Sequence, residues 1–540
     1  MKLLKLLKAI DPISVIPFGA ERIEQNAKRN TEDERHAKLT GMDIESIHYR
    51  AQEVLPGGMF VAIKGQTADG HDFINQALQK GAVAVVAQTE PSQPSLNECP
   101  ARAAATQPIM IRVPDTRQAM ADLAARFYGD PSENMTLIGI TGTNGKTTVA
   151  YLIESILLQA GHQTGVIGTI NYRYAGKAFN NPMTTPESLD LQRILAQMRG
   201  AGVTHVVMEA SSHAMDLYRI RRCWFDVAVF TNLSQDHLDF HGNMSSYWSC
   251  KKRLFTEYLT QGPKSERAVA VINCNDPRGK ELADSLSMPV VKTGSGSDCE
   301  IKAENYQCKL IGTTGKAATP GGSFDFKTPL VGVHNVENIL NAVGVGSALN
   351  IAPHTIRDGI EALAAIPGRL ESIASNTGRF VYVDYAHTPD ALENAVSAIK
   401  EIAPARIICV FGCGGDRDPK KRPLMGEIAA RLCDLSIVTS DNPRSENPLA
   451  IIEQILPGVR QAKGVEYSSR DLKAGFGKKG FAVEPDRRRA IELGINASRP
   501  GDAVLIAGKG HETYQILGNT TIDFDDREEA RKVLNRLNAN

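Results

Sequence analysis

The chain has 540 residues, with 61 basic and 61 acidic side chains and a formal net charge of zero at neutral pH. This length exceeds one hydrophobic core and predicts about two to four domains, while the balanced charge gives no field that would favour nucleic acid or an anionic membrane. No apolar run approaches the roughly 20 residues of a membrane span, and the nine cysteines are scattered without a CxxC pair, which indicates a reducing cytoplasm.

The N-terminal region, up to about residue 114, predicts a small α/β domain. Met1–Ile10 has apolar pairs broken by lysines, which indicates an amphipathic helix, too short and too charged for a signal peptide. Met59–Ile63 and Ala82–Ala87 predict buried strands, with a helix over Phe73–Lys80 between them. The Pro- and Ser-rich stretch Thr89–Gln107 predicts a surface loop.

The second domain, expected over residues 115–366, begins with a strand, a Gly-rich turn and a helix. The turn follows the apolar run Met135–Ile140 and precedes a helical pattern over Val149–Leu158. Glycines let backbone N–H groups close on phosphate oxygens, and the helix N-terminus adds its positive dipole end. The glycines are closer together than in the common P-loop. The strand and the helix on either side nevertheless favour a loop that binds a triphosphate over an incidental Gly-rich turn. Its residues are Gly142, Thr143, Asn144, Gly145, Lys146, Thr147 and Thr148.

More apolar runs in this region are typical of central parallel strands. They are Val166–Ile170, His205–Met208, Val227–Thr231 and Ala268–Ile272, and the Gly-rich stretch Gly294–Pro329 suggests a small antiparallel side sheet. After a break near residue 366, strands again alternate with helical patterns, which predicts a doubly wound, Rossmann-like α/β domain over residues 367–540. These strands are Phe380–Asp384, Arg406–Phe411, Leu435–Thr439 and Ala503–Ala507.

Two polar residues follow strands of the central domain. Glu209 ends one strand and His237 lies shortly after the next, at the sheet edge where α/β proteins bind ligands. Oxygen ligands from Thr147 and Glu209 suit a Mg²⁺ ion that bridges nucleotide phosphates. Taken alone, His237 would more simply be a loop imidazole that makes a structural hydrogen bond. Its position at the same sheet edge as Thr147 and Glu209 makes that explanation less attractive.

A series of short motifs, in order along almost the whole chain, resembles the Mur ligase family. The motifs are Thr141–Thr148, Glu209–His213, Asn232–His241, His334–Asn338, Pro367–Glu371, Asp384–Pro389, Phe411–Pro423, Asp441–Pro448 and Gly508–Glu512. The resemblance implies three domains: a small uridine-binding α/β domain, a central P-loop parallel-sheet ATPase domain and a C-terminal Rossmann-like domain. It also implies an ATP-dependent ligase that joins an amino acid to UDP-MurNAc-L-Ala-D-Glu.

The chemistry implied by the resemblance runs through an acyl phosphate. ATP would phosphorylate the free carboxylate of D-Glu, and an amine would then displace phosphate to leave an amide. Lys146 and two Mg²⁺ ions would offset the charge, with Glu209, His237 and a carbamylated Lys251 as further metal ligands. From the residues alone, Lys251, Lys252 and Arg253 could equally form one solvated helix face.

The resemblance extends the nucleotide and substrate sites beyond the loop. Further ATP contacts are expected from Asn335, Arg369 and Asp384, so ATP would bridge two domains whose closure completes the site. The UDP-substrate is expected at Gln66, Thr67, Ala68, Thr184, Thr185, Ser211 and Arg219. Two positions depart from the family pattern: Ala51 replaces a serine that contacts the nucleotide, and Leu217 stands where a glutamine is common.

The string Asp441-Asn442-Pro443-Arg444 indicates the incoming amino acid. Family members that add meso-diaminopimelate carry this arginine, whereas those that add L-lysine lack it. A guanidinium grips a carboxylate through two parallel hydrogen bonds, and diaminopimelate has an additional carboxylate at its far end. The expected pocket comprises Arg417, Asp441, Asn442, Pro443, Arg444, Gly508 and Glu512.

Several alternatives remain at this point. Two of them share the fold: the L-lysine-adding ligase and a folylpolyglutamate synthase-like enzyme. The N-terminal region argues against the second, because its substrate needs no uridine-binding domain. Outside the fold they are a non-catalytic module that binds ATP and a UDP-sugar, and a mechanical P-loop ATPase. We expect a cytoplasmic monomer whose partners are the small-molecule substrates ATP, UDP-MurNAc-L-Ala-D-Glu and meso-diaminopimelate, with Mg²⁺ as cofactor and neither nucleic acid nor membrane insertion.

Overall fold

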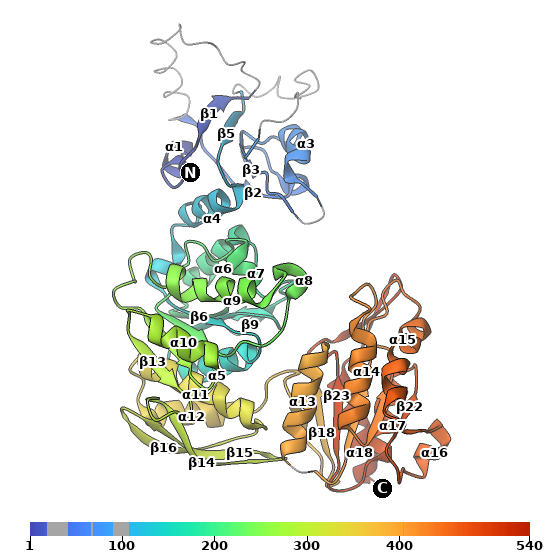
Figure 1. Cartoon of the computed structure of the whole chain (residues 1–540). Helices are drawn as coiled ribbons and strands as arrows, with labels where there is room; N and C mark the ends of the chain where they lie inside the picture. Colours follow the sequence, from blue (N-terminus) through green and yellow to red (C-terminus); the bar gives the residue numbers. More distant parts are fainter. Residues whose placement is uncertain (19–40, 66–67, 90–106, 403, 540) are drawn as a thin grey trace, which may run out of the picture.

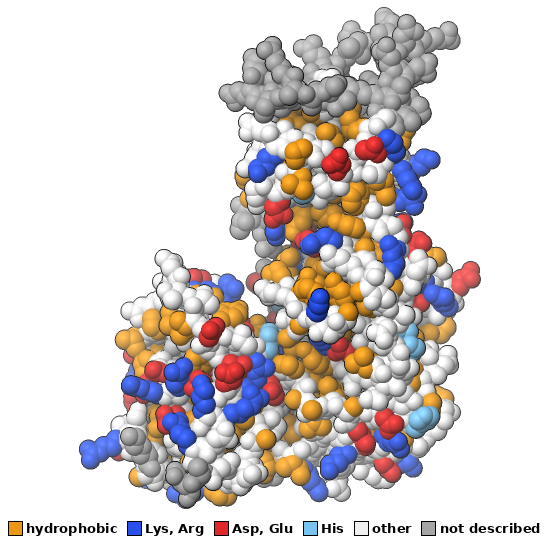
Figure 2. All heavy atoms as spheres, turned by 180° about the vertical axis from the view of Figure 1, so that it is seen from behind, with side chains coloured by type: hydrophobic (Ala, Val, Ile, Leu, Met, Phe, Trp, Pro, Cys, Tyr) orange, Lys and Arg blue, Asp and Glu red, His pale blue; other side chains and the backbone are white. Residues whose placement is uncertain are grey.

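The computed structural model of the chain describes residues 1–18, 41–65, 68–89, 107–402 and 404–539. Three α/β units follow one another, each built on its own sheet; the first two are stacked and the third lies beside the second (Figure 1). Figure 2 shows basic and acidic side chains mixed over the visible face, as the balanced composition predicts. Within the described ranges, no helix is long and apolar enough to cross a bilayer.

The N-terminal unit is a five-stranded sheet in the order β1-β5-β4-β3-β2, parallel except for β1. Its strands are β1 (Ser14–Pro17), β2 (Ile47–His48), β3 (Met59–Val61), β4 (Ala84–Ala87) and β5 (Ile109–Arg112). The predicted first helix is confirmed as α1 (Leu3–Leu7), which buries Leu3 and Leu6, and the predicted second helix as α3 (Ile74–Gln79). The expected surface loop at Thr89–Gln107 lies almost entirely outside the described residues.

The central unit is an eight-stranded sheet in the order β13-β12-β11-β6-β10-β7-β8-β9. The strands from β13 to β7 are parallel, and β8 and β9 add an antiparallel edge. The bounds are β6 (Thr136–Thr141), β7 (Thr164–Ile167), β8 (Tyr172–Tyr174), β9 (Lys177–Phe179), β10 (His205–Glu209), β11 (Val227–Phe230), β12 (Val269–Asn273) and β13 (Val290–Thr293).

Helices cover both faces of this sheet because its strands are apolar on both sides. One face packs against α6 (Ser188–Gly200), α7 (Ser212–Asp216), α9 (Met244–Arg253) and α10 (Pro277–Ser285), with α8 (Leu238–His241) beside α9. The other face packs against α5 (Lys146–Gln159), α11 (Val333–Ala348) and α12 (Pro353–Ala362). The expected side sheet is confirmed as antiparallel β14 (Lys302–Lys309), β15 (Gly312–Thr319) and β16 (Gly322–Thr328).

The C-terminal unit is a seven-stranded sheet in the order β17-β18-β23-β19-β20-β22-β21, parallel except for β17. Its strands are β17 (Glu371–Ile373), β18 (Phe380–Asp384), β19 (Ile407–Phe411), β20 (Leu435–Val438), β21 (Val465–Glu466), β22 (Gly480–Val483) and β23 (Ala503–Ala507). One face carries α13 (Pro389–Glu401), α14 (Lys421–Leu432) and α15 (Pro448–Gln461); the other carries α16 (Ser469–Lys473), α17 (Arg487–Ala497) and α18 (Asp526–Ala539). The predicted doubly wound architecture is confirmed, and a hairpin of β24 (Tyr514–Leu517) and β25 (Thr520–Asp523) projects from it.

The unit boundaries near residues 114 and 366 stay predictions. The first falls between β5 and α4 (Thr116–Phe127), yet α4 packs Met120 and Leu123 into the N-terminal core and also contacts α6. This helix therefore serves as the packed connection between the first two units.

Candidate active site

The Gly-rich loop joins the end of β6 to the start of α5, at the carboxyl edge of the central sheet. Gly142 and Gly145 have φ angles of 145° and 87°, and a Cβ at either would overlap Thr231 or Asn338, so both positions require glycine. The backbone N–H of Asn144 donates to Asn232 Oδ1 at 3.0 Å, which anchors the loop to the segment after β11. The backbone is therefore shaped to receive phosphate at a helix N-terminus.

A cavity of about 90 Å³ lies against the loop, lined by Thr143–Thr148, Thr169, Glu209 and Arg369. In its wall, the Thr147 hydroxyl donates to Glu209 Oε1 at 3.0 Å. Glu209 is 2% exposed and also accepts from the backbone N–H and the hydroxyl of Thr169, at 3.0 and 2.9 Å. The hydrogen bonds to this buried carboxylate come from hydroxyls and a backbone N–H, which leave its charge available to a cation.

The oxygen donors fit Mg²⁺, which binds through one or two carboxylates together with substrate phosphates and water. Among the residues that the structure describes, no three His, Cys, Asp or Glu side chains gather closely enough to hold a metal ion by themselves. The hydroxyl of Thr147 and the phosphates of a bound nucleotide would have to complete the coordination around Glu209.

Lys251, on α9, contacts the same loop. It is 1% exposed, and its Nζ donates to the carbonyl oxygen of Gly142 at 2.7 Å and lies 4.5 Å from the ring centre of Tyr247. Burial, and then the charge of Lys146, lowers the pKa of Lys251 well below its ordinary value. Lys252 is only partly buried, so the lysine directed at the loop is Lys251.

His237 stands at the start of α8 with φ of 53°, a left-handed conformation that turns the chain after β11. Its ring lies edge-on to those of His213 and Tyr247, with centroid distances of 4.8 and 6.2 Å. Partial desolvation lowers the pKa of His237, although 45% of its side chain is exposed and its Nε2 lies 3.4 Å from the Asp236 carboxylate, which acts in the opposite direction. A neutral imidazole can bind a metal through nitrogen. His237 and Lys251 thus share Tyr247 as a neighbour, but no direct contact with Glu209 joins them in the described structure.

The C-terminal unit contributes an arginine to the loop. Arg369 donates from Nη2 to the Thr147 hydroxyl at 3.4 Å, and its buried Nε has no hydrogen-bond partner among the described residues. Asp384 accepts from the backbone N–H groups of Leu370 and Ala386, at 2.7 and 2.8 Å, so it fixes the turn that carries Arg369. Burial raises the pKa of Asp384 against the opposing effect of Arg369.

Asn335 is connected to the loop through one intervening side chain, that of Asn338. It is buried, donates to Val331 O at 2.8 Å and accepts from Asn338 at 3.0 Å. Asn338 is the residue that approaches Gly145. The two asparagines stand three residues apart in α11, on the same face of the helix.

The residues expected at the muramyl part of the substrate gather beyond the end of β10. Thr184 and Thr169 share a hydroxyl contact of 3.1 Å, and Thr185 donates to Glu209 O at 2.7 Å and to Ser211 at 3.3 Å. Arg219 donates to Thr185 O at 3.2 Å and forms an ion pair with Glu187 at 2.8 Å. These side chains connect the Glu209 carboxylate to the region that faces the N-terminal unit.

A second cavity, of about 450 Å³, lies in the N-terminal unit. Its lining consists of Tyr49, Arg50, Ala51, Gln52, Phe60, Ile63, Gly65, Ala68, Gly70 and Phe73. Ala68 and the altered position Ala51 therefore both border it, whereas Gln66 and Thr67 lie outside the described residues. Leu217, the other departure, ends α7 and is partly buried.

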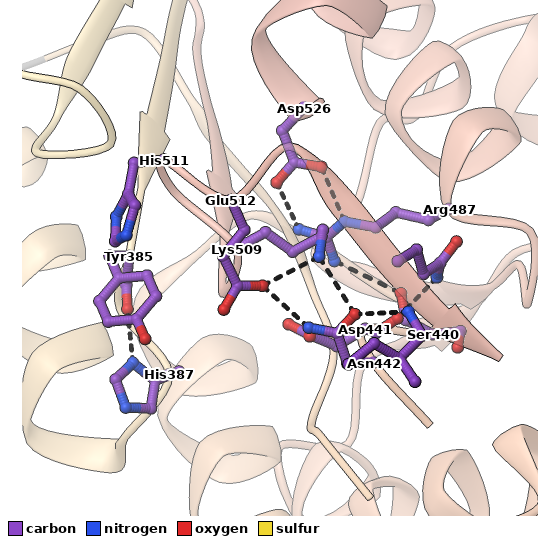
Figure 3. Close-up of polar contacts among 12 residues, drawn as sticks. Tyr385, His387, Ser440, Asp441, Asn442, Arg487, Lys509, His511, Glu512 and Asp526 are labelled. Carbon is purple, nitrogen blue, oxygen red and sulfur yellow. Dashed lines mark hydrogen bonds and ion pairs between the residues drawn. The ribbon is translucent and has the colours of Figure 1, made fainter. Parts of the chain in front are cut away.

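The expected amino-acid pocket is assembled from segments far apart in sequence (Figure 3). Asn442 Nδ2 donates to Glu512 Oε2 at 2.8 Å, and Gly508 N donates to Asp384 O at 3.0 Å. Asp441 is buried, and the Pro443 carbonyl accepts from Glu446 N at 3.0 Å. Arg417 is exposed in the neighbouring loop and donates to Asp416 O.

Arg444 has φ of 50°, and β24 holds its backbone from both directions. Its N–H donates to Ile516 O at 3.2 Å, and its carbonyl accepts from Gly518 N at 2.8 Å. One guanidinium nitrogen, Nη1, donates to Gly415 O at 2.8 Å. The Nε and Nη2 edge makes no hydrogen bond to a described residue, which leaves a two-pronged donor for a carboxylate.

Thr169, Asn338 and Lys509 are three residues of this site that the sequence analysis did not single out. Thr169 follows β7 and holds Glu209 through two hydrogen bonds. Asn338 and Lys509 both stand inside recognised motifs, so the motifs contained the signal. Only the folded structure shows which member of each motif faces the loop or the pocket.

The phosphate loop, its carboxylate and the arginine from a second sheet define a multidomain P-loop nucleotide-binding protein. The chain belongs to the Mur ligase family, the ATP-dependent ligases that form amide bonds. Three family models match: the Mur ligase family catalytic domain over residues 43–128, the Mur ligase middle domain over 140–346, and the Mur ligase glutamate ligase domain over 368–510.

Similar proteins match over nearly the full chain. UDP-N-acetylmuramoyl-L-alanyl-D-glutamate--2,6-diaminopimelate ligase of Geobacter metallireducens is 46% identical over 96% of this chain and 99% of its own length. A solved structure carrying the same enzyme name covers 97% of this chain and 100% of its own, with 29% identity and a TM-score of 0.65. MurF ligase of Thermotoga maritima, solved in complex with ADP, shares the fold at 20% identity, with a TM-score of 0.58 over 91% of this chain and 98% of its own.

Proposed function

We propose that this chain joins meso-2,6-diaminopimelate to UDP-MurNAc-L-Ala-D-Glu, with hydrolysis of ATP to ADP and phosphate, in the synthesis of peptidoglycan precursors. The observation that carries the proposal is Arg444, whose Nε and Nη2 make no hydrogen bond to a described residue. Its Nη1 donates to Asn442 O at 3.5 Å, and the Asn442 side chain donates to Glu512. Diaminopimelate ends in an ammonium and a carboxylate, and this pocket offers a carboxylate and a guanidinium. The name of the 46% identical relative supports the same substrates.

The phosphoryl step would take place at the loop. A carboxylate oxygen of D-Glu attacks the terminal phosphorus of ATP, and ADP leaves. Lys146, the loop N–H groups and Arg369 then face the charge that moves from nucleotide to acyl phosphate, so positioning and electrostatic stabilisation supply the catalysis. The amine of diaminopimelate next attacks the acyl carbon, phosphate leaves, and an amide remains.

Thr147 and Glu209 would hold one Mg²⁺, and His237 with a modified Lys251 would contribute to a second. The metal would neutralise phosphoryl charge during transfer. An unmodified lysine cannot serve as an anionic ligand, whereas a carbamate can.

The surroundings of Lys251 support its carbamylation. Addition of CO₂ requires a neutral amine: the nitrogen bonds to carbon, a proton is lost to solvent, and an N6-carboxylysine anion remains. Burial and Lys146 lower the pKa of Lys251, so more of its amine is neutral. The resulting anion would lie close to the Lys146 cation.

Phosphate release with omitted substrates tests the proposal. We expect release from ATP to depend on Mg²⁺, on UDP-MurNAc-L-Ala-D-Glu and on meso-diaminopimelate, with a tripeptide product detected by mass. Lysine preferred over diaminopimelate would instead establish the L-lysine-adding ligase. Nucleotide binding without any product would establish a non-catalytic module.

The remaining features of the proposal are a monomeric state and a cytoplasmic location. The eight described cysteines are all free thiols, which agrees with a reducing compartment. Size-exclusion chromatography with light scattering would test the monomer.

A further inference from the structure

Lys509 is a fully buried lysine beside the amino-acid pocket. It lies at 0% exposure in the turn after β23, between Gly508 and Gly510. A buried ammonium is costly unless it is paired and hydrogen-bonded, so the contacts that compensate for its burial show what it does there.

The ammonium of Lys509 closes a triangle of polar groups (Figure 3). Its Nζ donates to Glu512 Oε2 at 3.0 Å and to Asn442 Oδ1 at 3.2 Å. Asn442 Nδ2 donates to the same Glu512 oxygen at 2.8 Å. The triangle fixes the orientation of both acceptor side chains relative to each other.

One oxygen of Glu512 stays available to a ligand, whereas Asn442 Oδ1 also accepts from the backbone N–H of Ile516, at 3.0 Å. Glu512 Oε1 receives no hydrogen bond from the described residues, so it can accept from a substrate ammonium. Arg444 Nη1 donates to the backbone carbonyl oxygen of Asn442 at 3.5 Å. A zwitterionic ligand would be recognised by the Glu512 carboxylate and the Arg444 guanidinium. Lys509 contacts Glu512 directly and is connected to Arg444 only through Asn442.

A purely structural ion pair is the plainer explanation of a buried lysine, and the chain provides an example. Lys264, 2% exposed in the central unit, donates to Asp226 at 2.7 Å and to the Met135 carbonyl. Neither partner of Lys264 faces a cavity described here. Both partners of Lys509 belong to the pocket proposed for the amino acid.

A second buried cation already supplies structural support on the far side of the 440–442 turn. Arg487 pairs with Asp526 at 2.7 Å, with both side chains fully buried, and donates to Ala507 O at 3.0 Å and Ser440 O at 3.4 Å (Figure 3). The turn is therefore tied to β23 without Lys509, and the contacts of Lys509 are directed at the ligand-facing side chains.

We propose that Lys509 is a positioning residue that favours diaminopimelate over L-lysine by orienting Glu512 and Asn442 and by partly neutralising Glu512. The inference rests on the function proposed above. Without the Lys509 charge, Glu512 would become a stronger acceptor for any ammonium, and the positive potential that attracts the far carboxylate would weaken. The far end of L-lysine carries only an ammonium, whereas the far end of diaminopimelate carries an ammonium and a carboxylate.

Steady-state kinetics of Lys509→Met with each amino acid test this inference. We expect kcat/KM for diaminopimelate to fall about 10- to 100-fold, since a hydrogen bond between charged groups is lost. Use of lysine should hold or rise, while KM for ATP and for the UDP-substrate should change less than about twofold. Lys509→Arg, which keeps the charge, should recover part of the diaminopimelate activity.

The matched control is Lys264→Met, which removes a lysine of equal burial from the central unit. It should lower thermal stability without changing the ratio of diaminopimelate to lysine use. If Lys509→Met lowers kcat with both amino acids alike, or only destabilises the protein as the control does, the positioning role is refuted.

A double-mutant cycle with Glu512→Gln identifies the group through which Lys509 acts. In the Glu512→Gln background, Lys509→Met should have little further effect on KM for diaminopimelate; independent, multiplying effects would refute the coupling. If Lys509→Met alone does not fold, Glu512→Gln can still be compared with the double variant, which has no unpaired buried charge; a further large loss of diaminopimelate use in that comparison would refute the coupling. Failure of the wild-type enzyme to use diaminopimelate would refute the proposed function itself, so the activity of the wild type is measured before that of any variant.

Discussion

Lys146 and Lys251 donate to one and the same carbonyl oxygen, that of Gly142, at 3.0 and 2.7 Å. Two ammonium groups on one acceptor repel each other, and burial adds to the cost of charging them. Burial is the largest cause of the lowered pKa of both lysines, and the charge of Lys146 lowers that of Lys251 further. Conversion of Lys251 to an anion would replace this repulsion by attraction, which gives a physical reason for the modification at this position.

Replacement of Lys251 should abolish most turnover. We expect Lys251→Ala to lower kcat by at least about a hundredfold, because a metal ligand and its charge are lost, and short carboxylic acids should restore part of the rate. The adjacent Lys252→Ala is the matched control and should leave kcat close to wild type. A fully active Lys251→Ala enzyme would contradict the assignment, and intact-mass analysis would show whether the wild type carries added CO₂.

Removal of the Arg444 guanidinium should weaken recognition of diaminopimelate. Arg444→Ala should cost about 2–5 kcal/mol in kcat/KM for this substrate, because the far carboxylate loses its charged partner. Lysine use should be little affected. The control is Arg460→Ala, which removes an exposed arginine whose ion pair with Glu466 spans 4.0 Å. An unchanged KM for diaminopimelate in Arg444→Ala would exclude this role.

The contact between Arg369 and Thr147 predicts that the nucleotide site depends on the C-terminal unit. Arg369→Ala should raise KM for ATP about tenfold or more, since a charge-assisted contact is lost. Arg379→Ala is a control in the same unit, because Arg379 donates to Ser498 O, away from the loop. Equal ATP affinity in the Arg369 variant and the wild type, measured by equilibrium binding, would show that the loop binds ATP without the C-terminal unit.

A pair of histidines outside the site predicts a loss of stability in acid. The His205 ring stacks on His162 at 3.8 Å, and burial, followed by the charge of His162, lowers the pKa of His205 to about 4. The unfolded chain takes up this proton first, so stability should fall as the pH drops from about 6.5 towards 4, by about 1 kcal/mol after allowance for solvent screening.

The thermal unfolding midpoint of His205→Gln tests that prediction. The variant should lose less on acidification from about pH 7.5 to about pH 5 than the wild type does. The exposed His354 on α12 provides the control through His354→Gln. The same acid sensitivity in wild type and His205→Gln would mean that other groups are responsible.

The parallel cores were predictable because their strands are apolar on both faces, a pattern that survives without knowledge of tertiary contacts. β18 and β23 lie at their predicted positions, with bounds at Phe380–Asp384 and Ala503–Ala507. Edge strands such as β8 and β17 were not predicted, since they are short and half exposed and their pairing depends on neighbours far along the chain.

The site residues were predictable where one continuous motif forms one part of the site, as in the Gly142–Thr148 loop. They were less so where the direction of a side chain depends on tertiary packing. The burial of Lys251 against Gly142 O, rather than Lys252, depends on how α9 packs on the sheet. Asn338 and Lys509 remained hidden because spacing within a motif does not tell which member faces inward.

The attachment of Arg444 to β24 has a consequence for the stability of a truncated chain. The residues that complete the amino-acid pocket, Gly508 to Gly518, belong to the last part of the chain, directly before Phe524 and α18, which close one face of the C-terminal sheet. A chain that stops short of this segment would lack both the pocket and the cover of its sheet. Loss of the tail would therefore give an unstable protein rather than one that activates its substrate and then accepts any available amine.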